Sequence, residues 1–176
     1  MGNIDYQKIL FRTAMCVMTC DGEIHESEIK EMELAFKQTE FFKDLVFNDE
    51  MKMIVSEFEQ DEKKVVKDYF EQLASINLNP VQQLQILEIA LRIIYADERV
   101  DDNEVKFFKI VKSFLDVPDE ILYKRFGQLD YLGGEHSPDK LISTTNDFLD
   151  SIVLPEIQEM AKMIDNAETV NNSNTN

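Results

Sequence analysis

Two stretches of this chain carry the same acidic pattern and could together bind a divalent cation. In each copy an acidic residue follows an apolar helix, an aliphatic residue comes three positions later and a glutamate four positions after that: Asp21, Ile24 and Glu28, then Asp97, Val100 and Glu104. Four carboxylates supply hard oxygen ligands, which suit Ca²⁺, Mg²⁺ or Mn²⁺ better than zinc. The repeat therefore predicts one cation site, on the condition that the two turns converge.

The remaining residues of the pattern have expected structural roles. Gly22 follows Asp21 in a common turn dipeptide. Ile24 and Val100 are expected to be apolar plugs that bury each turn under the helices. A purely structural interpretation of the glutamates stays open, because Asp101-x-x-Glu104 has the spacing of a helix capping box.

Neither turn is an EF-hand. The stretch from Asp21 to Glu28 matches the later part of that calcium loop, from the glycine turn to the bidentate glutamate. The first ligand position would fall on Val17, and on Ile93 in the second copy, where an apolar side chain replaces an essential carboxylate. Each turn can therefore supply at most half of a cation site.

The helix that ends in Asp21-Gly22-x-Ile24, the later Glu28 and the second copy of this pattern resemble the TerB-like (tellurite-resistance protein B) superfamily. That superfamily includes the N-terminal domain of a membrane-anchored J-domain co-chaperone. The resemblance spans residues 4–128, and the second copy has Glu98 in place of the glycine, followed by Arg99. It implies a bundle of about seven helices with pseudo-two-fold symmetry, acidic residues that chelate a metal, and a role in stress response or phage defence. The implied motif positions are Asp21, Gly22, Ile24, Glu28, Asp97, Val100 and Glu104.

Apolar residues recur at a spacing of three to four residues along nearly the whole chain, which indicates amphipathic helices. We therefore expect helices to position the two turns. The spacing predicts helices at about 4–19, 29–36, 47–58, 66–76, 81–96, 105–115 and 119–129, with a weaker one at 141–153. The helix at 81–96 is apolar almost all round and is expected to be the most buried. The prediction is an all-α compact bundle of two pseudo-two-fold-related helical hairpins, with a helical C-terminal extension.

The predicted organisation has three parts. A TerB-like helical domain spans 1–129, a loop and C-terminal helical extension span 130–168, and a disordered polar tail spans 169–176. A last amphipathic helix is predicted after Pro155. Its apolar residues Ile157, Met160 and Ile164 are expected either to dock on the bundle or to contact a partner.

Composition restricts the partners. The formal charge is −17, from 18 basic and 35 acidic residues, and so acidic a surface repels nucleic acid and anionic membranes. We expect a protein partner with a basic surface, no nucleic acid and no membrane insertion. Cys16 and Cys20 are expected to be free thiols, as in a reducing cytoplasm.

Three functions follow in order of preference. The first is a non-enzymatic cytoplasmic stress-response or defence adaptor that binds one divalent cation between its two acidic turns. The second is a metal-independent protein–protein interaction subunit with the same fold. The third is a metal-dependent hydrolase, which the sequence supports least because no nucleophile, base and oxyanion set can be assembled.

Overall fold

A computed structural model describes residues 3–96, 99–127, 129 and 138–155. This part of the chain holds α-helices and one short 3-10 helix and contains no strand, which confirms the predicted all-α class. The helices are α1 (Asn3–Thr19), α2 (Glu26–Gln38), η1 (Glu40–Phe42), α3 (Phe47–Ser75), α4 (Pro80–Ile94), α5 (Asp102–Ser113), α6 (Asp119–Phe126) and α7 (Pro138–Ser151).

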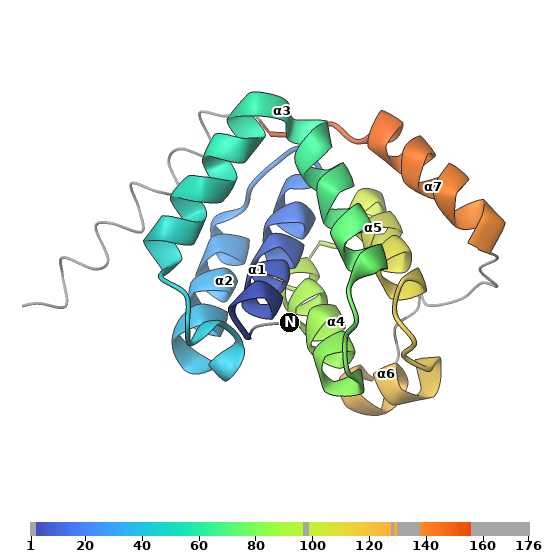
Figure 1. Cartoon of the computed structure of the whole chain (residues 1–176), viewed down its shortest axis with the longest axis horizontal. Helices are drawn as coiled ribbons and strands as arrows, with labels where there is room; N and C mark the ends of the chain where they lie inside the picture. Colours follow the sequence, from blue (N-terminus) through green and yellow to red (C-terminus); the bar gives the residue numbers. More distant parts are fainter. Residues whose placement is uncertain (1–2, 97–98, 128, 130–137, 156–176) are drawn as a thin grey trace, which may run out of the picture.

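α1 and α4 pack against each other at the centre of the molecule (Figure 1). α4 begins where the sequence predicts, with Asn79 accepting a hydrogen bond from the Gln82 backbone N–H at 3.0 Å and Pro80 in the first turn. Its apolar residues are almost all buried, as its all-round apolar sequence predicts. Each of the two central helices leads into one acidic turn, and the next helix, α2 or α5, begins after that turn.

α3 forms an arch over the central helices (Figure 1). The sequence predicts two helices here, whereas the structure has one element with a kink at Asp61, whose φ of −164° and ψ of 95° are extended rather than helical. The Asp61 Oδ1 accepts a hydrogen bond from the Lys64 backbone N–H at 3.0 Å. Asp61 therefore caps the second half of α3, and the two predicted helices are its two arms.

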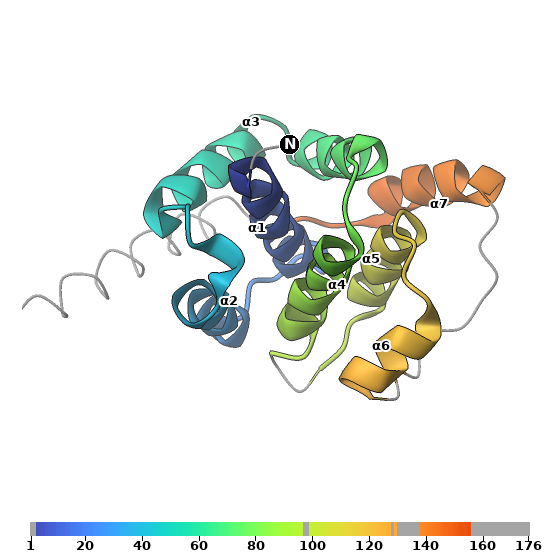
Figure 2. The same ribbon diagram turned by 60° about the horizontal axis from the view of Figure 1, so that its bottom comes forward.

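α7 packs beside α5 and the second arm of α3 (Figure 2). The Phe148 ring lies 6.2 Å from both the Phe70 and the Phe107 ring centroids, and Leu149 and Ile152 are buried. The described part of the predicted extension thus shares one hydrophobic core with the preceding helices. The predicted tail at 169–176 lies outside the described residues.

The core contains two groups of aromatic rings. One joins α1, α2, η1 and the start of α3 through Phe11, Phe36, Phe42 and Phe47. The other joins α3, α5 and α7 through Tyr69, Phe70, Phe107, Phe114 and Phe148. We call the second group the aromatic junction. The buried Tyr69 hydroxyl also hydrogen bonds to the Thr13 hydroxyl at 2.9 Å, which ties the junction to α1.

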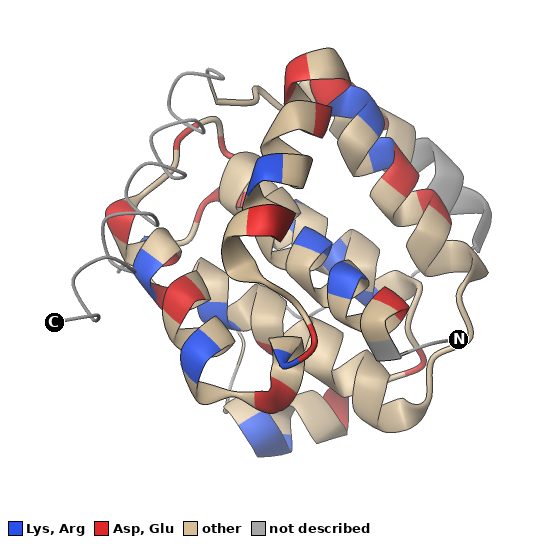
Figure 3. Ribbon diagram, turned by 60° about the vertical axis from the view of Figure 1, so that its left-hand side comes forward, with Lys and Arg blue, Asp and Glu red and all other residues tan. Residues whose placement is uncertain are grey.

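The charged residues lie mainly on the outside. On the face in Figure 3, basic residues are interspersed with acidic ones along the helices rather than gathered into one stripe. In the described part of the chain, no helix is both long and apolar enough to cross a bilayer. Cys16 and Cys20 are free thiols, as predicted, and both are buried.

Candidate functional site

The first acidic turn connects α1 to α2 through a glycine with a positive φ. Gly22 has a φ of 91°, a conformation that side chains with a Cβ rarely adopt. Beside it, the Asp21 Oδ1 accepts a hydrogen bond from the Glu23 backbone N–H at 3.0 Å. The Glu28 Oε2 accepts another from the His25 backbone N–H at 2.8 Å. The turn is therefore held by its own carboxylates.

The second turn repeats part of this arrangement at the start of α5. The Glu104 Oε2 accepts a hydrogen bond from the Asp101 backbone N–H at 2.7 Å. The Asp101 Oδ1 accepts one from the Asn103 backbone N–H, also at 2.7 Å. These contacts complete the capping box that the sequence allows, and Glu28 occupies the equivalent position in the first turn. Helix capping is therefore one role of both glutamates, which are only 3% and 5% exposed.

The two turns converge on one pocket, as the repeat predicts. A cavity of about 230 Å³ is lined from the first turn by Asp21, Glu23 and His25, and from the second by Arg99, Val100, Asp101 and Glu104. We call this cavity the acidic pocket. Its carboxylates outnumber its two basic side chains, so it favours a cationic ligand.

Electrostatics inside the acidic pocket reflect this crowding. Burial raises the pKa of Asp21, and the Asp101 carboxylate raises it further, against opposing effects of the Glu23 backbone N–H and of His25. The Nε2 of His25 lies 3.9 Å from the Asp21 Oδ2. Behind the turn, burial raises the pKa of the Cys20 thiol, and the nearby Glu104 and Asp21 carboxylates add to the shift. A bound cation would relieve the repulsion between these carboxylates.

The predicted site residues have different outcomes. The structure brings Asp21 and Glu104 to one pocket, whereas Glu28 is buried and does not line that pocket. Ile24 is half-buried and packs on the core, consistent with a plug. Val100 is 41% exposed, so the prediction that it plugs its turn is wrong. Its side chain lines the wall of the acidic pocket instead of lying beneath the turn.

Other predicted residues lie outside the described part of the chain. They are Asp97 in the second turn, and Ile157, Met160 and Ile164 in the predicted partner-binding helix.

The donor chemistry of the pocket suits a hard cation, but the described carboxylates do not form a complete site. Asp21 and Asp101 present oxygen ligands from opposite turns. Among the residues that the structure describes, no three His, Cys, Asp or Glu side chains are arranged to hold a metal ion. A cation would therefore need a further ligand or a closer approach of the two turns.

The raised pKa of Asp21 gives a first testable prediction, on the protein without added cation. The folded state binds a proton on the Asp21 carboxyl more tightly than the unfolded state does. Protonation of Asp21 therefore stabilises the fold at low pH, and this stabilisation is lost as pH rises through the folded-state pKa. Asp21→Asn cannot ionise and keeps the oxygen that accepts from Glu23. We expect it to raise the free energy of unfolding at neutral pH by about 0.5 kcal/mol, a value discounted for partial exposure.

Urea unfolding between pH 3 and pH 8 would test this prediction. The difference between the native protein and Asp21→Asn should appear as pH rises above the ordinary aspartate pKa of 3.8 and become constant above the folded-state pKa. A less stable Asp21→Asn protein at neutral pH would contradict it.

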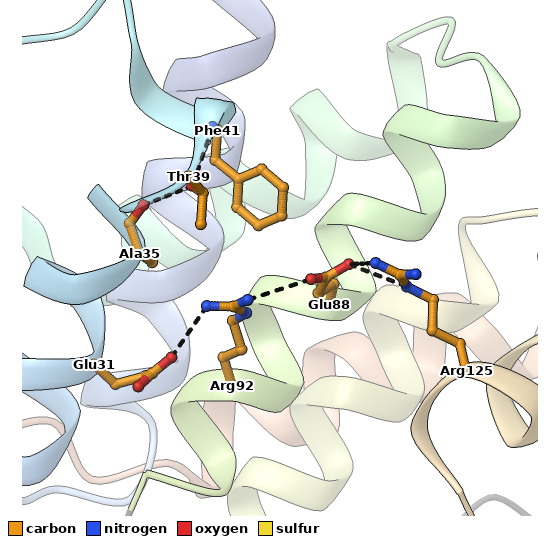
Figure 4. A network of polar contacts seen from close by, with 7 residues as sticks. All are labelled: Glu31, Ala35, Thr39, Phe41, Glu88, Arg92 and Arg125. Carbon is orange, nitrogen blue, oxygen red and sulfur yellow. Dashed lines mark hydrogen bonds and ion pairs between the residues drawn. The ribbon is translucent and has the colours of Figure 1, made fainter. Parts of the chain in front are cut away.

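A second polar cluster, which the sequence interpretation missed, joins α2, α4 and α6 (Figure 4). The Glu88 carboxylate binds two guanidinium groups: Arg125 Nη2 lies 2.8 Å from its Oε2, and Arg92 Nη2 lies 3.6 Å from its Oε1. Arg92 also reaches the Glu31 Oε1 at 3.3 Å, and its guanidinium carbon lies over the Phe41 ring, 5.9 Å from the ring centroid. The available signal was Glu88 itself, the one acidic residue in the sequence of α4. We call these residues the Glu88 network.

One comparison with known proteins identifies a relationship. The model of the family described as tellurite resistance protein TerB matches residues 10–124, which is well over half of the chain. No curated protein and no solved structure matches the chain. The matched range includes both acidic turns and ends within α6, before α7 begins.

Proposed function

The chain belongs to the tellurite resistance protein TerB family, and from this membership we propose that it is a non-enzymatic cytoplasmic stress-response or defence module that binds one divalent cation in its acidic pocket. The convergence of the two acidic turns on one cavity is the observation that carries this proposal. Two hairpins far apart in the sequence bring carboxylates together, although their mutual repulsion is unfavourable.

Ca²⁺, Mg²⁺ and Mn²⁺ are the candidate ions. Asp21 and Asp101 would contribute ligands from opposite turns, and Asp97 is a further candidate from the sequence. Glu28 and Glu104 each use one oxygen to cap a helix. The bound ion would neutralise the carboxylates and fix the spacing of the turns.

A metal titration followed by thermal melting of the full chain tests this function. A cation that binds only the folded state raises the melting temperature as its concentration rises. We expect that rise with at least one of the three ions, and we expect Asp21→Asn combined with Asp97→Asn to abolish it. The matched control is Asp68→Asn combined with Glu71→Gln, which removes two carboxylates from the exposed side of α3. No rise with any ion, or an equal loss in the control, would contradict cation binding.

A metal-independent interaction subunit is the second candidate, and the composition of the pocket favours it. Arg99 and His25 line the same cavity as the carboxylates and can partly neutralise them without an ion. In that case the acidic pocket would receive a lysine or arginine side chain of a basic protein partner.

A lysine-rich peptide distinguishes this candidate from cation binding. Backbone chemical shifts that change only at residues 20–28 and 99–104, in the presence of a chelator, would support it. Changes spread over the whole acidic surface would contradict a specific interaction.

A further inference from the structure

The segment after α7 crosses the back of the first acidic turn. We call residues 152–155 the C-terminal strap. Ile152 and Pro155 are buried, Leu154 packs on the core, and the Val153 side chain points outward with 70% exposure. The backbone of the strap is therefore held on both sides of Val153.

The contact between strap and turn is made at Gly22. A Cβ placed on this glycine would lie 2.9 Å from the Val153 carbonyl oxygen and 3.6 Å from its carbonyl carbon. Only a residue without a side chain lets the two backbones approach so closely. Two features therefore require a glycine at position 22: the positive φ of the turn and the space that the strap occupies.

The same C-terminal extension also contacts the helix that carries the second turn. Glu104 lies in the first turn of α5, and Phe107 follows it three residues later. The Phe107 ring packs against Phe148 of α7 in the aromatic junction. Residues 138–155 therefore contact the first acidic turn at Gly22 and, through Phe107, the helix that begins after the second turn.

We propose that residues 138–155 are a brace that positions the first acidic turn relative to α5, so that docking of the C-terminal strap and binding in the acidic pocket are thermodynamically linked. The binding half of this statement rests on the proposed function. By linkage, a cation in the pocket tightens the strap by the same factor by which the docked strap raises cation affinity. The brace lies after the matched family range, which ends at residue 124.

A pair of glycine substitutions in the full chain tests the contact itself. Gly22→Ala and Gly127→Ala both place a Cβ at a positive φ, 91° and 83°, but no atom lies within 4 Å of the Cβ position at Gly127. Both variants therefore place a side chain at a positive φ, and only Gly22→Ala adds a clash with the strap. The probe is hydrogen exchange of the Ile152 amide, which donates to the Phe148 carbonyl oxygen at 3.0 Å.

We expect Gly22→Ala to speed exchange at Ile152 by about tenfold, the change produced by a loss of about 1.4 kcal/mol, and Gly127→Ala to leave that exchange close to native. Equal exchange at Ile152 in the two variants would overturn the proposal.

A second pair of variants changes residues of α7 and measures the effect on the first acidic turn. This test does not depend on a substitution at Gly22. Phe148→Ala removes the ring that anchors α7, and Asn146→Ala changes an exposed residue of the same helix. Without any cation, Phe148→Ala should speed exchange at the His25 amide, which donates to Glu28, more than at the Leu45 amide, which donates to the Phe42 carbonyl oxygen. Asn146→Ala should change neither. Acceleration that is the same at His25 and Leu45 would show general destabilisation and overturn the positioning role.

The last measurement separates this proposal from the proposed function. In the native protein, whichever of Ca²⁺, Mg²⁺ or Mn²⁺ raises the melting temperature should slow exchange at Ile152, and Gly22→Ala should weaken binding of that ion relative to Gly127→Ala. If no cation binds while the cation-free results hold, the proposed function fails and the brace stands. If a cation binds and Gly22→Ala has the same affinity as Gly127→Ala, the linkage is overturned.

Discussion

Phe107→Ala is expected to lower the free energy of unfolding by about 3–5 kcal/mol, the range for a fully buried aromatic ring. Phe107 is 0% exposed and lies at the centre of the aromatic junction. Its ring stacks on Tyr69 at 5.8 Å and lies 5.4 Å from Phe70 and 6.2 Å from Phe148. The substitution would leave a cavity where α3, α5 and α7 meet, and these elements cannot all close around it.

Urea denaturation followed by far-UV circular dichroism would measure this loss. Phe107→Leu, which retains most of the apolar volume, should cost less than about 1.5 kcal/mol. Tyr123→Ala removes an aromatic ring that is 38% exposed on α6 and should change stability by less than about 1 kcal/mol. A loss below about 1 kcal/mol for Phe107→Ala would mean that the three elements do not pack together as described.

Glu88→Ala is expected to cost about 2 kcal/mol, a value between those for exposed and for fully buried ion pairs. The Glu88 side chain is 12% exposed, and its loss leaves two guanidinium groups without their shared carboxylate. The cost stays below that of a fully buried pair, because the Arg125 side chain is 52% exposed and can be solvated.

A double-mutant cycle would isolate the interaction. Arg125→Ala alone and combined with Glu88→Ala should give a coupling energy of about 1 kcal/mol between these two side chains. Glu88→Gln, which keeps the size and one acceptor oxygen, should retain part of the stability. Additive effects of Glu88→Ala and Arg125→Ala would contradict a direct contribution from this pair. Raised salt should reduce the coupling only modestly, because Glu88 is largely buried.

Local sequence signals were sufficient to predict most of the helices. α4 combines a capping asparagine, a proline in its first turn and apolar residues almost all round, so its start and its burial were both predictable. The continuity of α3 was not, because Asp61 interrupts the helical dihedrals while its side chain starts the next turn at once. A cap of that kind has the same sequence signature whether a loop or a kink precedes it.

The part of the site that follows from the repeated acidic pattern was predictable from the sequence. A duplicated pattern on two helices that pack together predicts that the two turns converge, and they do. The exposure of Val100 was not predictable, because the repeat gives both aliphatic residues the same local context while the surroundings differ. The need for a glycine at position 22 was likewise only partly predictable, because the space for the Val153 carbonyl group is required by a segment far along the chain.

The reaction rates of the two buried thiols report how often the central helix α1 opens. Cys16 and Cys20 are both 0% exposed on α1 or at its end, and burial raises the pKa of Cys16 to about 12. A thiolate is the species that reacts with disulfide and alkylating reagents, so neither residue can be modified while the fold is closed. Labelling kinetics at Cys16 would therefore time the release of α1 from its neighbours, and those at Cys20 the loosening of the first turn, without any engineered probe.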